Sequence, residues 1–241
     1  MELSGYSQIA PQSLYSSSDI QMATLGQRFM TADGREFAYC KAGELLVVGD
    51  FYQTAVHSSD YVSQALAVAA SIGDTSVTIT LGSSAATKDQ FKDGYLIVSA
   101  GTGIGQMFLI KGNAAANAAA SCVFTLDEPV RVALATADST ITVIKNRFDS
   151  IVKWAVTQTG SSAGAAVYPV ASGEYGWVQV GGTGCALSDN VATAAETTGI
   201  SPSTTTAGAI TKAVTTQETI GGAAQVVTVS AEVGAIRLNL Q

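Results

Sequence analysis

Apolar and polar residues alternate in short stretches along most of the chain. Residues 35–41 alternate charged with apolar side chains, the period of two that predicts a half-buried strand. Residues 75–81 are rich in β-branched side chains and also predict a strand. Residues 61–72 fit two states, because Ala and Leu favour a helix while their spacing favours a strand. We interpret 61–72 as the first strand of a hairpin that turns at Gly73 and Asp74.

Further short strands, separated by turn signals, are predicted between residues 88 and 145. The glycines at 101, 103 and 105 predict a hairpin loop, because glycine adopts the positive φ of tight turns. The alanine-rich tract 113–120 is too short and too weakly amphipathic to hold as a helix, so we expect a loop. This spacing is typical of a β-sandwich or barrel. The predicted strands are residues 95–98, 106–111, 122–126 and 139–144.

A second group of strands is predicted in the last 90 or so residues. It comprises residues 151–156, 175–181 and 225–240, the last as a terminal hairpin, while residues 190–196 are compatible with a short helical turn. The sequence therefore predicts an all-β fold with short antiparallel strands in sandwich-like or barrel-like domains. We expect an extended N-terminal arm at 1–30, a β domain at 31–147, and a second β segment or domain at 148–241 that packs on the first.

The first 30 residues lack a clear helical or strand period. They are polar, with scattered large apolar side chains at Tyr6, Leu14, Tyr15 and Phe29. We interpret this stretch as an arm that lies on a neighbouring molecule, so that deleting it weakens binding and leaves the β fold intact. The alternative is a frayed terminus.

The amino-acid composition limits the kinds of partner that we expect the chain to bind. Charged residues make up 13% of the chain, about half the usual share, and the net charge is −7. An acidic chain without a basic cluster lacks the electrostatic footprint of a nucleic-acid-binding protein. The longest apolar run, 65–70, is far shorter than a membrane-spanning helix. We therefore expect neither nucleic acid nor membrane as a partner, and low charge suggests that other copies or partners cover much of the surface.

The N-terminus lacks the basic and apolar regions of a signal peptide. We therefore expect a protein made in the cytoplasm. The three cysteines, Cys40, Cys122 and Cys185, are far apart in sequence and have no metal-ligand spacing. Reduced, buried thiols are the expectation for all three.

No motif predicts catalysis. The Gly101–Gly105 loop lacks the spacing and the following helix of a phosphate-binding loop. The run from His57 to Asp60 contains His, Ser and Asp, but a catalytic triad is assembled from residues distant in sequence. The acidic residues fit turns better than paired acid/base groups or a calcium loop; they are Asp89, Asp93, Asp127 and Glu128. We expect no enzyme activity, no cofactor and no metal.

Trp177 lies in a strand pattern between glycine-rich turns. It is either a core residue of a small β domain or, as a sharper hypothesis, a binding hot spot. The interface candidates from sequence are therefore Tyr6, Leu14, Tyr15, Phe29 and Trp177.

Several blocks of the chain resemble proteins of tailed-bacteriophage particles. The blocks run over residues 93–111, 127–134 and 173–179. Residues 37–49 and 220–240 are similar to capsid decoration (cement) proteins of these phages. The blocks are patterns of strands and turns, spread over residues 34–240.

The resemblance implies a structural protein of the virion surface, made in the host bacterial cytoplasm. Many copies would bind the lattice of the major capsid protein, commonly as homotrimers, and the family carries no catalytic residues. Weak contacts repeated over many copies add up by avidity. Three alternatives remain open: a head-fibre base or tail component, a secreted adhesin or carbohydrate-binding module, and an enzyme.

Overall fold

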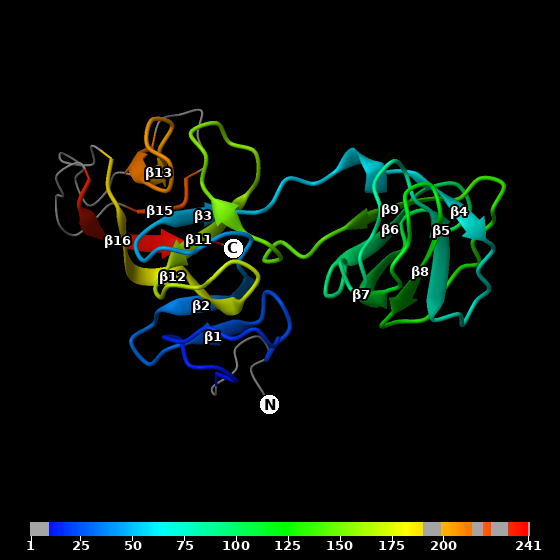
Figure 1. The fold of residues 1–241 in the computed structure, drawn as a ribbon, viewed down its shortest axis with the longest axis horizontal. Helices are drawn as coiled ribbons and strands as arrows, with labels where there is room; N and C mark the ends of the chain where they lie inside the picture. Colours follow the sequence, from blue (N-terminus) through cyan, green and yellow to red (C-terminus); the bar gives the residue numbers. More distant parts are fainter. Residues whose placement is uncertain (1–9, 190–198, 214–218, 223–230, 241) are drawn as a thin grey trace. The chain divides into compact units, whose positions relative to one another are not determined.

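The chain folds almost entirely as β-strands. The computed structural model describes residues 10–189, 199–213, 219–222 and 231–240 (Figure 1). The regular structure in these ranges is strands and one short 3-10 helix, Ser59–Tyr61, and all paired strands are antiparallel. The predicted all-β class with short antiparallel strands is confirmed.

The chain divides into two units, and the division differs from the expected one. Unit 1 comprises Met1–Val56 and Arg147–Gln241, and unit 2 is His57–Asn146. In unit 1, strand β3 (Phe51–Gln53) pairs with β10 (Val152–Lys153), and Gln53 lies opposite Val152. Unit 2 therefore occupies the place of a hairpin loop in unit 1. Sequence patterns placed the boundary near 147 but missed the one near 56, because strand signals continue across it.

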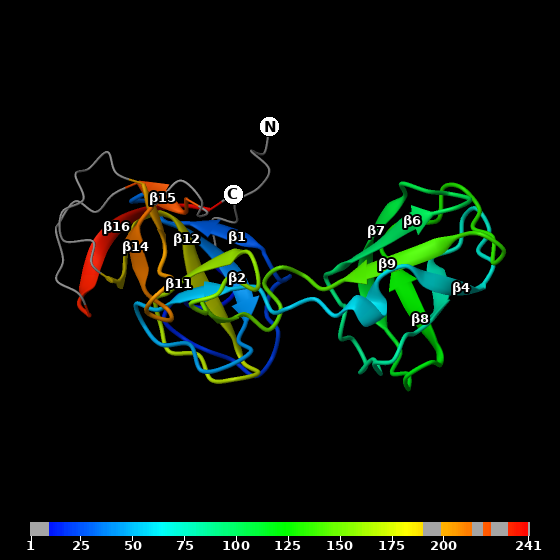
Figure 2. The same cartoon turned by 90° about the horizontal axis from the view of Figure 1, so that it is seen from above.

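Unit 2 is a closed six-stranded barrel with the strand order β4-β5-β8-β7-β6-β9; Figure 1 labels all six strands, and Figure 2 shows the barrel from above. Pairing of β4 with β9 closes the barrel, so its first and last strands are neighbours. The predicted hairpin is confirmed, since Leu66 of β4 pairs with Ile79 of β5. The strands are β4 (Gln64–Val68), β5 (Ser76–Thr80), β6 (Tyr95–Ala100), β7 (Met107–Asn113), β8 (Ser121–Leu126) and β9 (Thr140–Ile144).

Two buried amide side chains at the ends of β7 hold the barrel's loops. The Asn113 Oδ1 accepts a hydrogen bond from the Phe91 N–H at 2.9 Å, and its Nδ2 donates to the Thr87 carbonyl at 2.8 Å. Gln106 Oε1 accepts from the backbone N–H groups of Arg131 and Val132. These bonds satisfy loop backbone groups that would otherwise be buried without partners. The alanine-rich tract that follows Asn113 forms a loop, as predicted.

Unit 1 is a sheet built around the long strand β12 (Tyr175–Leu187). Its first half pairs with β2 (Glu36–Lys41) on one edge and β11 (Ser162–Ala166) on the other, and its second half pairs with β16 (Val233–Asn239). The remaining strands extend this sheet; they are β1 (Arg28–Met30), β13 (Ile200–Pro202), β14 (Ile210–Lys212) and β15 (Gly221–Gly222).

Strand β2 is buried on both faces, whereas its alternation predicted one exposed face. Its four central residues, Phe37 to Cys40, are all fully buried. The Tyr39 side lies under the N-terminal segment, because the Tyr39 hydroxyl donates to Gln12 Oε1 at 2.9 Å and accepts from the Met22 N–H at 3.0 Å. The charged residues that flank this stretch, Glu36 and Lys41, are half-buried. The second cover comes from residues 17 to 27 positions before Tyr39 in sequence, which periodicity does not reveal.

Some predictions lie outside the described residues. The helical turn expected at 190–196 and the side chain of Tyr6 belong to this group. So does much of the first arm of the hairpin predicted at 225–240. The described strand of that pair, β16, is bonded to β12 and β15.

We expect residues 57–146, expressed alone, to fold cooperatively. The barrel closes on itself and has its own core, which includes Phe91, Phe108 and Phe124. Thermal unfolding followed by circular dichroism should show one transition, and Phe108→Ala should destabilise the fragment by about 3–5 kcal/mol. A fragment without a cooperative transition would show that unit 2 depends on unit 1.

Candidate interaction surface

The N-terminal segment of the described chain is fixed to unit 1 through Gln12. Its side-chain Nε2 donates to the carbonyls of Ser16 (2.9 Å) and Tyr175 (3.1 Å). The backbone carbonyl of Gln12 accepts a hydrogen bond from Trp177 Nε1 at 3.1 Å. Together with the bond from Tyr39, these contacts satisfy a buried amide. Gln12 thus fixes the irregular N-terminal segment to the paired strands β2 and β12.

An aromatic cluster lies beneath this segment. The Trp177 ring packs against Tyr39 with centroids 5.1 Å apart in an edge-to-face arrangement, and against Phe29 at 6.0 Å. Such ring pairs add to the free energy gained by burying the area itself. Further along the segment, Leu25 is buried and Ser18 forms a backbone bridge with Tyr175. Residues 10–30 are therefore part of the unit 1 fold.

The structure places the predicted interface residues in different environments. Trp177 is 1% exposed and is therefore a core residue, which is the first of the two interpretations that the sequence left open. Leu14 and Phe29 are half-buried and pack on the same core. Tyr15 is exposed, and Tyr6 lies outside the described residues. Because the segment carries core contacts, the structure does not support the expectation that residues 1–30 can be removed with the fold intact.

The same segment exposes large apolar side chains. Ile20 is 65% exposed, and Tyr15 and Met22 are each 54% exposed, although the backbone around them is bonded to unit 1. Met30, in β1, is exposed as well. We call Tyr15, Ile20, Met22 and Met30 the arm surface. Sequence reasoning missed the last three, because single apolar residues in a polar segment carry no period.

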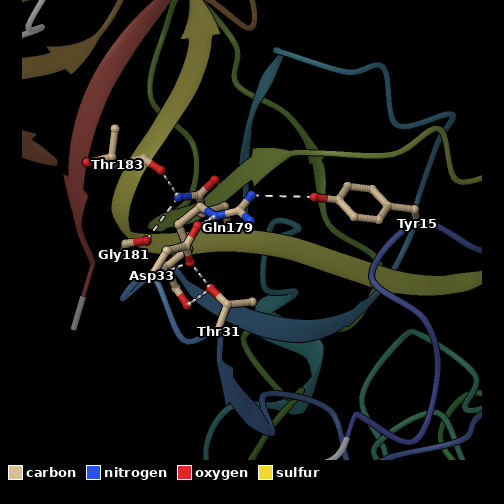
Figure 3. A network of polar contacts seen from close by, with 7 residues as sticks. Tyr15, Thr31, Asp33, Gln179, Gly181 and Thr183 are labelled. Atoms are coloured by element: carbon tan, nitrogen blue, oxygen red, sulfur yellow. Dashed lines mark hydrogen bonds and ion pairs between the residues drawn. The ribbon is translucent and has the colours of Figure 1, made fainter.

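A polar group adjoins the arm surface at the turn between β1 and β2 (Figure 3). Arg35 Nε donates to Asp33 Oδ2 at 2.7 Å, and Arg35 Nη1 reaches the Tyr15 hydroxyl at 3.4 Å. The Thr31 hydroxyl donates to Asp33 Oδ1. Gly34 supplies the positive φ, +80°, that this turn requires. The turn holds the guanidinium beside the exposed Tyr15 ring.

These contacts shift the pKa values of the two charged groups in the turn. The hydrogen bond from Thr31, reinforced by Arg35, lowers the pKa of the Asp33 carboxyl. The contact with Tyr15, followed by that with Asp33, raises the pKa of the Arg35 guanidinium. Both groups are ionised at neutral pH and face solvent, so the pair adds little to stability.

Gln179 braces the sheet next to this turn (Figure 3). Its buried side-chain Nε2 donates to the carbonyls of Gly181 at 3.0 Å and Thr183 at 2.9 Å. The register of β12 against β2 shifts between Gln179 and Gly181. The amide thus satisfies carbonyls at a bulge, a place where the ladder is locally disrupted.

The other candidate motifs have local structural roles. Ser58 caps the 3-10 helix by accepting from the Asp60 N–H at 3.2 Å, and the Ser84 hydroxyl donates to Asp60 at 2.5 Å. Partial burial, followed by the charge of Lys145, lowers the pKa of His57. The glycines at 101, 103 and 105 all have positive φ in the loop between β6 and β7, so the hairpin-loop prediction is confirmed. In the ranges given above, no group of three or more His, Cys, Asp or Glu side chains is placed to hold a metal ion.

No known protein family, curated protein or solved structure matches this chain. Among the described residues, no helix has the length and apolar character needed to cross a membrane.

Replacing Gln12 with Ala should destabilise unit 1 by about 2–4 kcal/mol, because three side-chain hydrogen bonds are lost and buried partners stay unsatisfied. Tyr15→Ala is the matched control, since its exposed ring should change stability by less than about 0.5 kcal/mol. Urea unfolding followed by tryptophan fluorescence measures both. Equal effects of the two substitutions would contradict the anchoring role of Gln12.

One of the three thiols should react in the native protein. Cys185 is exposed, which corrects the prediction that all three cysteines are buried. Burial raises the pKa of Cys40 to about 12 and also raises the pKa of Cys122, so both remain protonated and shielded. Titration with a thiol reagent at pH 8 should count one fast thiol, and three after denaturation. Loss of the fast thiol in Cys185→Ser confirms the assignment; a fast signal that remains contradicts it.

Proposed function

We propose that this chain is a structural virion protein that decorates and stabilises the outer surface of a tailed-phage capsid by binding the major capsid protein lattice. The observation that carries the proposal is the arm surface: exposed apolar side chains on a segment that Gln12 and Leu25 fix to a folded sheet. A fixed segment loses little conformational entropy on binding. More of the free energy gained by burying its apolar side chains therefore contributes to affinity.

Two further features support this proposal. The sequence blocks that resemble proteins of tailed-phage particles lie in both units, at 93–111 and 127–134 in unit 2 and at 173–179 in unit 1. The blocks that are similar to capsid decoration proteins, 37–49 and 220–240, belong to unit 1. The two-unit construction offers two separate surfaces in one chain, which suits a protein that links components of a shell. A protein repeated over a lattice needs only modest affinity for each contact.

The arm surface can be tested by co-sedimentation with undecorated capsids of the source phage. The wild-type chain should saturate at a fixed number of copies per capsid. The triple variant Tyr15→Ser, Ile20→Ser, Met22→Ser should bind at least about tenfold more weakly, because three exposed apolar contacts are lost. Its unfolding midpoint should match the wild type.

Leu45→Ser serves as the control. Leu45 is 57% exposed in unit 1 but lies outside the arm segment, so binding should be unchanged. If the triple variant binds like the wild type, the arm surface is not the contact. If the wild-type chain fails to bind capsids and is found at a few copies per particle, a fibre-base or tail role replaces the proposal.

A further inference from the structure

Aspartate is followed by glycine at two places in the chain, Asp33–Gly34 and Asp93–Gly94, each in a turn before a strand. This dipeptide is chemically labile, because glycine has no Cβ to hinder its backbone nitrogen. The glycine nitrogen forms a bond to the aspartate Cγ, and the carboxyl hydroxyl leaves with the amide proton as water. Water then opens the resulting succinimide ring at either carbonyl, which gives aspartate again or isoaspartate. Whether a folded chain reacts depends on the space and the freedom of the backbone at each site.

The first dipeptide lies at the exposed end of the β1–β2 hairpin. The Asp33 side chain is 57% exposed. Apart from its chain neighbours, no described atom lies within 4 Å of the position that a Cβ on Gly34 would occupy, so the turn has room for the ring. Two backbone hydrogen bonds of 2.9 Å close the turn, from Gly34 N–H to the Thr31 carbonyl and from Thr31 N–H to the Arg35 carbonyl. Cyclisation at Asp33 therefore requires only the end of one hairpin to open.

The second dipeptide is enclosed by the unit 2 barrel. Asp93 is 8% exposed, its N–H donates to the Ile110 carbonyl at 2.9 Å, and its carbonyl accepts from Asn146 Nδ2 at 2.8 Å. The Gly94 carbonyl accepts from the Ile110 N–H at 2.9 Å. A Cβ on Gly94 would lie 2.3 Å from the Ile144 carbonyl oxygen, so the backbone here has no free space. Cyclisation at Asp93 therefore requires the barrel strands to separate.

We propose that Asp33–Gly34 is a covalent modification site, at which the folded protein forms isoaspartate without an enzyme, and that the fold protects Asp93–Gly94. Local opening at the end of a hairpin costs much less free energy than the separation of core strands. The two sites contain the same reacting atoms, so the difference between them comes from the fold.

The turn slows the reaction at Asp33 without blocking it (Figure 3). The Thr31 hydroxyl donates to Asp33 Oδ1, and Arg35 Nε donates to Oδ2 at 2.7 Å. Both bonds hold the carboxyl group in place and must break before the ring closes. They also favour the ionised form, since the bond from Thr31, reinforced by Arg35, lowers the pKa of the Asp33 carboxyl. A carboxylate is a poorer electrophile than the neutral acid.

The modification changes the turn itself. In isoaspartate the Asp33 Cβ becomes part of the main chain, which is one carbon longer, and the carboxylate is attached to Cα. The turn that holds the Arg35 guanidinium 3.4 Å from the Tyr15 hydroxyl is thereby altered. The change takes place at the margin of the arm surface, to which Tyr15 belongs. None of this chemistry depends on the proposed capsid role.

Peptide mapping of the full chain after prolonged incubation at neutral pH tests the site. Trypsin releases residues 29–35 and 93–111, which contain one dipeptide each, and electron-transfer fragmentation distinguishes isoaspartate from aspartate. Isoaspartate should accumulate in 29–35 at least about tenfold faster than in 93–111, because the second site needs the costlier opening. In urea, where the fold is lost, the two peptides should convert at similar rates. Equal rates in the native protein would overturn the proposal, as would a native 29–35 peptide that stays unconverted while the unfolded one reacts.

Variants of Thr31 test the restraint on the reaction. Thr31→Val should raise the native rate in 29–35 by about two- to tenfold, the factor that corresponds to one lost hydrogen bond. Thr31→Ser, which keeps the hydroxyl, should react like the wild type. Asp33→Glu should abolish the signal in 29–35 and leave 93–111 unchanged, because glutamate does not form the five-membered ring. A wild-type rate in Thr31→Val would show that the hydroxyl does not restrain the carboxyl group.

Discussion

The central strand of unit 1, β12, must pair its backbone on both edges and cover large side chains on both faces. Residues 177–179 are bonded to β2 on one side and, at 178 and 179, to β11 on the other, so neither edge is open there. Trp177 on one face is covered by residues 10–30, and Val178 on the opposite face lies in the sheet's core. An unpaired edge or an uncovered tryptophan at this point would cost several contacts at once.

That requirement accounts for the behaviour of the N-terminal segment. The segment has few regular hydrogen bonds of its own, and it stays in place because Gln12 bonds to groups from β2 and β12 simultaneously. Its exposed apolar residues are therefore presented by a fixed backbone. In the proposed function, the same contacts that complete the core of unit 1 also prepare the arm surface for a partner.

A different physical constraint applies to unit 2. Closure of β4 on β9 removes free sheet edges from the barrel, so its strands cannot recruit a partner by edge pairing. Only side chains on the outer surface and loops are then open to a partner. On that surface the outward residues of β9, β6 and β7 are mostly apolar, and those of β5 and β8 carry mostly hydroxyls. The two units thus offer separate surfaces of distinct character.

Local patterns in the sequence determined the six barrel strands, β2, the first half of β12, the glycine turn at 101–105, the alanine-rich loop and the all-β class, because side-chain period and backbone preference act over a few residues. They did not reveal the short strands β1, β11, β13, β14 and β15 of unit 1. They could not show that residues 57–146 form an insertion, since the pairing of Gln53 with Val152 joins residues about 100 positions apart. Nor could they assign the faces of β2, whose second cover arrives from Gln12 and Met22. Tyr15 was found as an interface candidate from sequence, whereas Ile20 and Met22 became visible only once the fold showed which apolar side chains the core leaves exposed. Burial depends on what packs against a residue, and tertiary structure alone decides that.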